Sequence, residues 1–132
     1  MYVTSKGGDT VELTVKGSKN TPDVLEAAKN FYKNADPESI LRKSNGSYEI
    51  KYKNGYNYIG KGGFERAMTS AKQHAGSLDN IESINWRSAK SERDAFIDEY
   101  LRQKDFGGVL SSDKELKTYN QIWSPGKKYY GD

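Results

Sequence analysis

A tight turn between two tyrosine-rich segments most constrains how this chain can fold. Tyrosine and isoleucine alternate with charged residues over residues 47–52, and a second segment rich in tyrosine follows over residues 56–60. Asn54-Gly55 separates them, and this dipeptide is a strong signal for a turn between antiparallel strands. The sequence therefore predicts a β-hairpin over residues 47–60.

The length of this turn decides which side chains share a face of the hairpin. With a two-residue turn of Asn54 and Gly55, Tyr48 and Tyr58 point to opposite faces. With a three-residue loop that begins at Lys53 and holds Gly55 in the left-handed conformation, the two tyrosines share one face. Both turns agree with the sequence, but only the second brings the two phenols into one site.

The segments after the hairpin favour a helix, a strand and a second helix. Apolar residues over 64–75 have the spacing of one helical face, and a third strand is predicted over 81–87. Ser91 is a predicted N-cap of the next helix, which ends at Gly107. We therefore expect an α/β (α+β) fold, with a small central antiparallel or mixed sheet flanked by helices and an irregular tail.

Residues 1–44 read as a structured lead-in to a domain formed by residues 45–132. Alternating apolar residues predict a hairpin over residues 2–15. Thr21, followed by proline, is a predicted N-cap of a helix, and a short helix is predicted over residues 36–41. This lead-in contains no motif with recognisable chemistry.

Composition excludes several classes of function. The chain of 132 residues has no cysteine and one histidine, which excludes disulfides, thiol catalysis, zinc–thiolate sites and histidine-rich metal sites. It has no apolar run long enough to cross a membrane, and residues 1–20 lack the apolar stretch of a signal peptide. The net charge of +3 indicates a mild preference for polyanionic partners, although a protein with ordinary solvated side chains can have the same net charge.

Two triads in the predicted hairpin resemble the paired signature of the GIY-YIG nuclease family. Gly-Ser-Tyr ends at Tyr48, and Tyr-Ile-Gly begins ten positions later at Tyr58. Lys61 follows the second triad directly, as is common in the family. Ser47 departs from the pattern, because the family has an aliphatic residue there. The resemblance spans residues 46–123 and implies a metal-dependent endonuclease with the fold of that family.

The resemblance also suggests roles for residues outside the hairpin. Arg66 lies in the first turn of the predicted helix, like the family arginine, and Glu99 resembles the metal-binding glutamate. Asn120 resembles the asparagine that closes the site. His74 is added as the single histidine near a helix end. The candidate catalytic residues are Tyr48, Tyr58, Lys61, Arg66, His74, Glu99 and Asn120.

Phosphodiester hydrolysis requires the chemistry that these residues offer. A hard cation such as Mg²⁺, or Mn²⁺ in its place, often uses one carboxylate and several waters, and Glu99 is the predicted ligand. The guanidinium of Arg66 matches phosphate oxygens. A tyrosine beside a lysine and a metal ion can have its pKa lowered enough to pass a proton. We expect this of Tyr58 with Lys61, while Tyr48 positions water or phosphate.

The layout also resembles the C-terminal toxin domain of bacterial polymorphic or contact-dependent toxins. This implies secretion within a larger toxin and action in the target-cell cytoplasm, or a cytoplasmic location if the domain is expressed alone. We expect a monomer that binds nucleic acid, with DNA favoured over RNA, and an acidic immunity protein as partner. Candidate substrate contacts are Lys51, Lys53 and Lys72.

Other interpretations remain open. The tyrosines can simply pack in a hairpin, Arg66 and Glu99 can be solvated helix residues, and His74 can interact with a helix C-terminus. A non-catalytic module could use its tyrosines to stack on bases. A metal-independent ribonuclease could use His74 with Lys61 or Arg66 for acid–base chemistry. Cleavage with Mg²⁺ and with a chelator distinguishes these functions.

Overall fold

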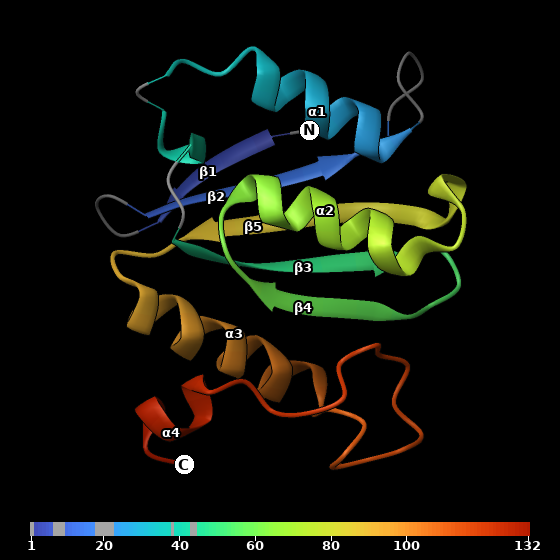
Figure 1. Ribbon diagram of the computed structural model, residues 1–132, viewed down its shortest axis with the longest axis vertical. Coiled ribbons are helices and arrows are strands. Elements are labelled where there is room, and N and C mark those ends of the chain that lie inside the picture. Colours follow the sequence, from blue (N-terminus) through green and yellow to red (C-terminus); the bar gives the residue numbers. More distant parts are fainter. Residues whose placement is uncertain (1, 7–9, 18–22, 38, 43–44) are drawn as a thin grey trace.

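The centre of the molecule is one five-stranded antiparallel sheet (Figure 1). The computed structural model describes residues 2–6, 10–17, 23–37, 39–42 and 45–132. The strands, in spatial order, are β1 (Tyr2–Lys6), β2 (Thr10–Lys16), β5 (Ile81–Ser88), β3 (Gly46–Tyr52) and β4 (Asn57–Lys61). The predicted fold class, a small central sheet with flanking helices, is confirmed.

The lead-in is part of this sheet. β1 and β2 form the predicted hairpin, and β2 pairs with β5 along its length. The turn residues between the two strands, 7–9, lie outside the described part of the chain. Residues on both sides of the expected boundary at 44 and 45 therefore share one sheet and one core.

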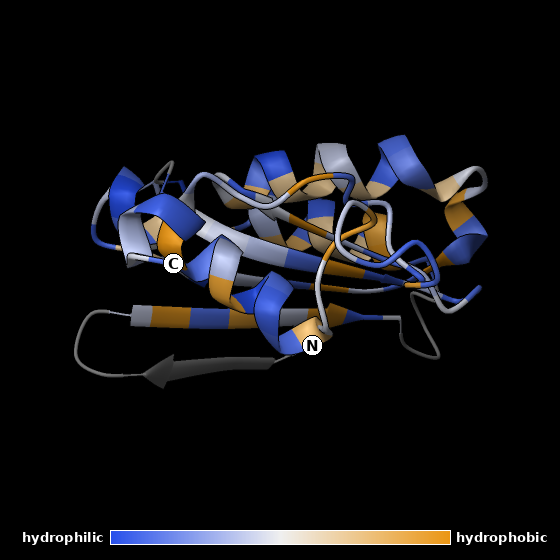
Figure 2. Cartoon of the chain, turned by 90° about the horizontal axis from the view of Figure 1, so that it is seen from below, coloured by the Kyte–Doolittle hydropathy of each residue, from blue (hydrophilic) through white to orange (hydrophobic). Residues whose placement is uncertain are grey.

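Helices cover both faces of the sheet. α1 (Val24–Lys33) and α2 (Phe64–Ala75) pack on one face, whereas α3 (Glu92–Phe106) packs against β3 and β4 from the other. The short helix α4 (Gly126–Tyr130) lies against α3. In Figure 2 the helices on the first face turn their hydrophobic residues toward the sheet. Among the helices of the described residues, none is long and apolar enough to cross a membrane.

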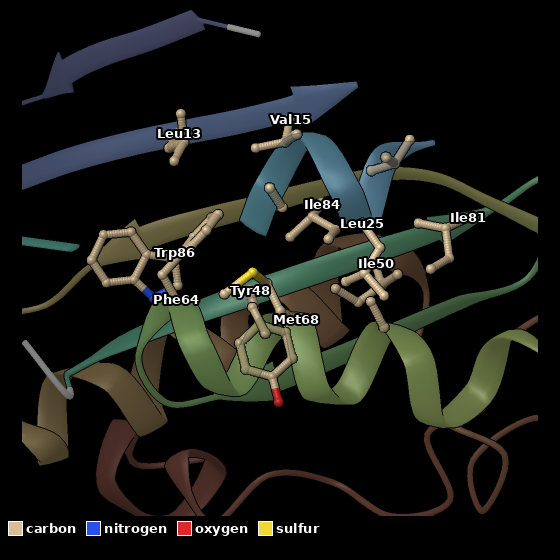
Figure 3. Close-up of a cluster of buried hydrophobic side chains, with 14 of the residues drawn as sticks. Leu13, Val15, Leu25, Tyr48, Ile50, Phe64, Met68, Ile81, Ile84 and Trp86 are labelled. Carbon is tan, nitrogen blue, oxygen red and sulfur yellow. The ribbon is translucent and has the colours of Figure 1, made fainter. Parts of the chain in front are cut away.

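The core lies between the sheet and the first pair of helices (Figure 3). Leu13, Trp86 and Tyr48 stand side by side on three neighbouring strands and are almost fully buried. Phe64 meets the Trp86 ring edge-on, with ring centroids 6.3 Å apart. The Trp86 indole donates a hydrogen bond to the carbonyl of Gly62, at 3.0 Å, so its polar atom is satisfied inside the core.

The hairpin has the three-residue loop. Tyr52 donates its backbone N–H to the carbonyl of Tyr56 (2.9 Å), and Gly55 donates to the carbonyl of Tyr52 (3.0 Å). Gly55 has a φ of 89°, a conformation that glycine adopts without steric cost. In the resulting register Tyr48 and Tyr58 lie on the same face, as the nuclease hypothesis requires.

The starts of α2 and α3 agree with the predictions, whereas the helical segments of the lead-in differ from them. α2 has its predicted bounds, and Ser91 caps α3 by accepting a hydrogen bond from the N–H of Asp94. The predicted N-cap of α1 is wrong: Asp23 caps it, while Thr21 lies outside the described residues. The short helix over 36–41 is a 3₁₀ turn, Ile40–Arg42, and a second such turn is Leu78–Asn80.

Candidate functional site

A cleft of about 450 Å³ opens where α2, β4, α3 and the tail meet. β4 is an edge strand of the sheet, so α2 on one face and α3 on the other approach each other across it. The tail residues 120–125 form the remaining wall. Five of the seven candidate catalytic residues line this cleft: Tyr58, Arg66, His74, Glu99 and Asn120.

Tyr48 lies beneath the cleft and not on its surface. Its side chain is only 1% exposed, and its hydroxyl shares a hydrogen bond of 2.6 Å with the hydroxyl of Ser70 on α2. The hydroxyl also interacts with the side chain of Arg66, and burial raises the pKa of Tyr48. Tyr48 is therefore a neutral phenol that contacts Arg66, and it acts on the cleft through that residue.

Glycine at two positions of the hairpin has a packing explanation. Gly60 faces Tyr48 across the β3–β4 pair, and a Cβ added there would overlap the phenol ring. A Cβ on Gly46 would meet the Trp86 indole. The glycines of both triads are thus required by large aromatic neighbours in the core, whatever the chemistry of the cleft.

Tyr58 is held by aromatic contacts on the cleft wall. Its ring stacks on His74, with centroids 4.4 Å apart, and His74 stacks in turn on Tyr119 at 5.2 Å. The pKa of Tyr58 is raised by burial and by the charge of Glu99, which outweigh the opposite effect of Arg66. The lowering of this pKa beside a bound metal ion stays a prediction, and without the ion the pKa is raised.

Lys61 does not pair with Tyr58. The two residues are three positions apart on one strand, so their side chains leave opposite faces. The Lys61 ammonium forms an ion pair with Glu92 (3.3 Å) and lies 4.6 Å from the centre of the Phe96 ring. Its positive charge still favours the ionised form of Glu99, and this partly offsets the rise in the pKa of Glu99 that burial causes. The predicted Tyr58–Lys61 partnership is wrong, because the side chain of Lys61 extends from β4 toward Glu92 and Phe96 of α3.

Adjacent carboxylates on α3 point to different environments. Glu99 lines the cleft, and burial raises its pKa despite the opposite effects of the nearby Ser124 hydroxyl and the Lys61 charge. Asp98 faces the far side of the sheet, where it binds Arg87 at 2.9 Å and accepts a hydrogen bond from Ser47. Glu99 is therefore the carboxylate of α3 that can serve the cleft.

The donor set around Glu99 fits a hard divalent cation held mainly by water. No group of three histidine or acidic side chains gathers anywhere in the described ranges. Mg²⁺ commonly binds proteins through one or two carboxylates and keeps several waters. A single carboxylate in an open cleft is compatible with that mode of binding.

Both polar atoms of the Asn120 side-chain amide form hydrogen bonds with the backbone of β4. Its Oδ1 accepts the N–H of Ile59, and its Nδ2 donates to the carbonyl of Ile59, both at 2.7 Å. The hydroxyl of Thr118 also donates to Oδ1. Asn120 thus fastens the tail to the edge strand, and it contributes to the cleft by fixing this wall.

The three lysines predicted to bind substrate do not form one surface. Lys51 faces the far side of the sheet, beside Arg87 and Arg102. Lys53 lies in the exposed hairpin loop, and Lys72 lies on the outer surface of α2 next to α1. The structure therefore does not bring these three candidate substrate contacts together at the cleft.

Several residues that build the cleft were not predicted. Gln103 is buried, and its Oε1 accepts the N–H of Ser124 at 2.8 Å. Ser124 donates its hydroxyl to the carbonyl of Phe96 at 3.1 Å. These bonds hold the tail against α3. Ser124-Pro125 is a local turn signal, but nothing in the sequence indicates its partner on α3.

Comparisons with protein-family models, curated proteins and solved structures found no match to this chain. The features of this chain that bear on its function are therefore the residues of the cleft and the two triads of the hairpin.

Proposed function

We propose that this protein is a metal-dependent endonuclease that hydrolyses phosphodiester bonds in the cleft between α2, β4 and α3. The observation that carries the proposal is that Arg66, Glu99 and Tyr58 line one open cleft, with the charges of Arg66 and Glu99 both close enough to act on Tyr58. A guanidinium and a carboxylate that share a cleft can hold a phosphodiester and a divalent cation together. The resemblance of the triads to the GIY-YIG signature supports the same reaction.

Each residue has a role that follows from its surroundings. Arg66 binds the non-bridging oxygens of the phosphate and stabilises the charge that grows on them. Tyr48, bonded to Ser70, orients Arg66 from below. Tyr58 keeps its proton at neutral pH because its pKa is raised, so it donates a hydrogen bond to the phosphate or to the attacking water.

Glu99 would hold Mg²⁺ or Mn²⁺, which when bound polarises the phosphate and makes a coordinated water more acidic. Asn120, Gln103 and Ser124 fix the tail wall that faces Glu99. His74 holds the ring of Tyr58 in place by stacking.

The decisive experiment compares cleavage of plasmid DNA and total RNA with Mg²⁺ and with EDTA. Wild type is expected to cleave only with the metal, and Glu99→Ala is expected to be inactive under both conditions. Asp105→Ala is the matched control, because Asp105 is an exposed carboxylate on the same helix. Full activity of Glu99→Ala, or loss of activity in Asp105→Ala, would contradict the proposal.

A metal-independent ribonuclease is the second candidate, because His74 lines the cleft and burial lowers its pKa. A neutral imidazole at pH 7 can accept a proton. RNA cleavage that persists in EDTA and disappears in His74→Ala would favour this function over the first.

The biological setting is proposed from the toxin resemblance. The domain would then be delivered within a larger secreted protein, act on DNA in the cytoplasm of a competing cell, and be neutralised by an acidic immunity protein. Expression in the bacterial cytoplasm should then arrest growth, and expression of Glu99→Ala should not. Growth arrest of equal strength by both proteins would contradict the proposed setting.

A further inference from the structure

A group of aromatic and cationic side chains surrounds α4, and we name it the C-terminal face. It consists of Arg93, Lys104, Trp123, Lys127, Lys128, Tyr129 and Tyr130. Tyr129 and Tyr130 are 45% and 50% exposed, which is unusual for large aromatic side chains on adjacent positions. These two side chains therefore present aromatic surface to solvent at α4.

Cations lie over the aromatic rings of this face. The ammonium of Lys127 is 5.6 Å from the centre of the Trp123 ring, and that of Lys104 is 5.7 Å from the Tyr130 ring. Lys104 also pairs with Asp132 at 3.1 Å. Among the described residues, no carboxylate forms an ion pair with Lys127 or Lys128, although the charge of Lys127 does act on Asp132. Lys128 is exposed and Lys127 is half-buried, so both ammonium groups lie where an external anion can approach them.

The C-terminal face is continuous with the cleft. Trp123 and Pro125 line the cleft, and Pro125 begins α4. The tail passes along α3 from the cleft to α4 (Figure 1). A ligand strand that leaves the cleft past Trp123 therefore passes Lys127, which lies over the Trp123 ring.

The face is rigidly mounted. Gly126 packs so closely on α3 that a Cβ there would overlap the backbone of Phe96. Tyr100 contacts the Trp123 ring edge-on at 5.5 Å and donates a hydrogen bond of 2.7 Å to Asp132. A surface fixed in this way keeps its spacing from the cleft, as a binding site for one continuous ligand requires.

We propose that the C-terminal face binds a single-stranded stretch of the nucleic acid whose scissile phosphate lies in the cleft. This inference rests on the proposed function. Lys127 and Lys128 contact successive phosphates, and the exposed rings of Tyr129 and Tyr130 stack on unpaired bases. Ammonium groups beside partly exposed aromatic rings are a combination that suits single strands, since every base has a ring face to stack. An acidic protein could also contact the lysines and pack on the tyrosines, and that occupant is an outcome of the test below.

Binding can be measured separately from cleavage. Fluorescence anisotropy of labelled 16-nucleotide DNA and RNA strands, in EDTA, would be followed over a range of salt concentrations with full-length Glu99→Ala and further variants in that background. Lys127→Ala/Lys128→Ala is expected to weaken binding by about tenfold or more. It should reduce the slope of log K against log salt by about 1.4, because each phosphate contact on a single strand accounts for about 0.7.

Two further pairs of substitutions complete the test. Tyr129→Ala/Tyr130→Ala should weaken binding at least about fivefold without changing the salt slope, since stacking on one base contributes about 1–3 kcal/mol by alanine substitution. The matched control is Lys29→Ala/Lys33→Ala, which removes two exposed charges from α1 and should leave binding unchanged. The same losses for DNA and RNA indicate that the shared backbone and base chemistry is recognised, whereas a loss for one strand type assigns the face to that type.

Several outcomes would overturn the inference. Equal weakening by the α1 control would reduce the effect to net charge. Unchanged affinity in the tyrosine pair, together with displacement of the oligonucleotide by polyglutamate, would assign the face to an acidic protein. A failure of the nuclease proposal is seen separately, as full plasmid cleavage by Glu99→Ala, and it leaves the anisotropy result intact.

Discussion

At the scale of single residues, the hairpin motif combines packing constraints with exposed chemistry. Gly60 makes room for the Tyr48 phenol, while Tyr58 on the same face reaches the cleft. The sequence was sufficient to predict that Tyr48 and Tyr58 share a face only if the turn has three residues. It was also sufficient to show that Lys61, three positions after Tyr58, leaves the other face. The expectation that Lys61 acts with Tyr58 followed from their closeness in sequence and overlooked this consequence of strand geometry.

Loss of Arg66 should reduce transition-state stabilisation while the protein stays folded. This residue is exposed on the first turn of α2, so Arg66→Ala should leave the melting temperature almost unchanged. Cleavage should fall on the order of 10²–10³-fold. Arg66→Lys should restore little, because lysine lacks the two-pronged guanidinium. Rates under single-turnover conditions test this, and a lysine variant as active as wild type would disprove the bidentate role.

Ionised Glu99 should lower the free energy of unfolding at pH values above its pKa. Burial raises the pKa of Glu99 in the folded protein, so the folded state binds a proton more tightly than the unfolded state. Stability therefore falls as the pH rises from the ordinary glutamate pKa through the raised value. Glu99→Gln should accordingly unfold at higher denaturant concentration than wild type at pH 7, with a smaller difference at pH 4.

Urea unfolding at the two pH values measures this effect of Glu99. A glutamine variant that is less stable than wild type at pH 7 would show that the carboxylate is stabilised in the fold. Asp105→Asn, which alters an exposed group on the same helix, should give no such pH dependence.

Gly60→Ala should destabilise the fold by about 1–3 kcal/mol, as expected for overpacking. The new methyl group would overlap the Tyr48 ring. The same substitution in a Tyr48→Ala background should cost much less, because the clashing ring is gone. Chemical denaturation of the four proteins of this cycle provides the measurement, and equal costs in both backgrounds would contradict the packing explanation.

At the scale of elements, a closed polar network fixes α3 to the far face of the sheet. Asp98 binds Arg87 and Ser47, and Arg87 binds Glu12 on β2. Arg102 donates to Ser47 (2.8 Å) and to Asn85 (2.7 Å), and its burial lowers its pKa to about 10. Since Glu99 follows Asp98 directly, this network also sets the position of the candidate metal ligand.

Asp98→Ala should destabilise the protein by about 3 kcal/mol, because it leaves Arg87 and Arg102 without their shared carboxylate in a poorly solvated place. Asp105→Ala, on the exposed surface of the same helix, should change stability by less than about 0.5 kcal/mol. Urea midpoints of the two variants make the comparison. Similar midpoints for both would mean that the network adds nothing to stability.

The elements differed in how well the sequence predicted them. The predicted bounds of α2 agree with the observed ones, because its apolar spacing is regular and glycines flank it. α4 was missed, because five residues are too few to show helical periodicity. The tail wall of the cleft depends on contacts such as Gln103 with Ser124, which join residues far apart in sequence. Local patterns contain no information about such pairs.

At the scale of the whole molecule, the first two strands complete the sheet on which the cleft depends. Leu13 and Val15 of β2 pack beside Trp86 and Ile84 of β5 and are fully buried. Removing β1 and β2 would expose this row and leave β5 as an unpaired edge. Exposed apolar edges promote aggregation.

A fragment of residues 45–132 should therefore fail to fold as a soluble, active unit. Circular dichroism, size-exclusion chromatography and plasmid cleavage would be compared with the full chain. A monomeric fragment with a cooperative melting transition and full activity would instead show that residues 1–44 are a dispensable lead-in.

The bonds between Asn120 and Ile59 have a consequence for self-association. β4 is an edge of the sheet, and its outer N–H and carbonyl groups would otherwise be free to pair with a strand from another copy. The amide of Asn120 and the backbone of Tyr119 and Lys117 occupy these groups instead. The same tail therefore covers the edge of the sheet and walls the cleft, so its release would open the cleft and expose an edge able to pair with another chain in one step.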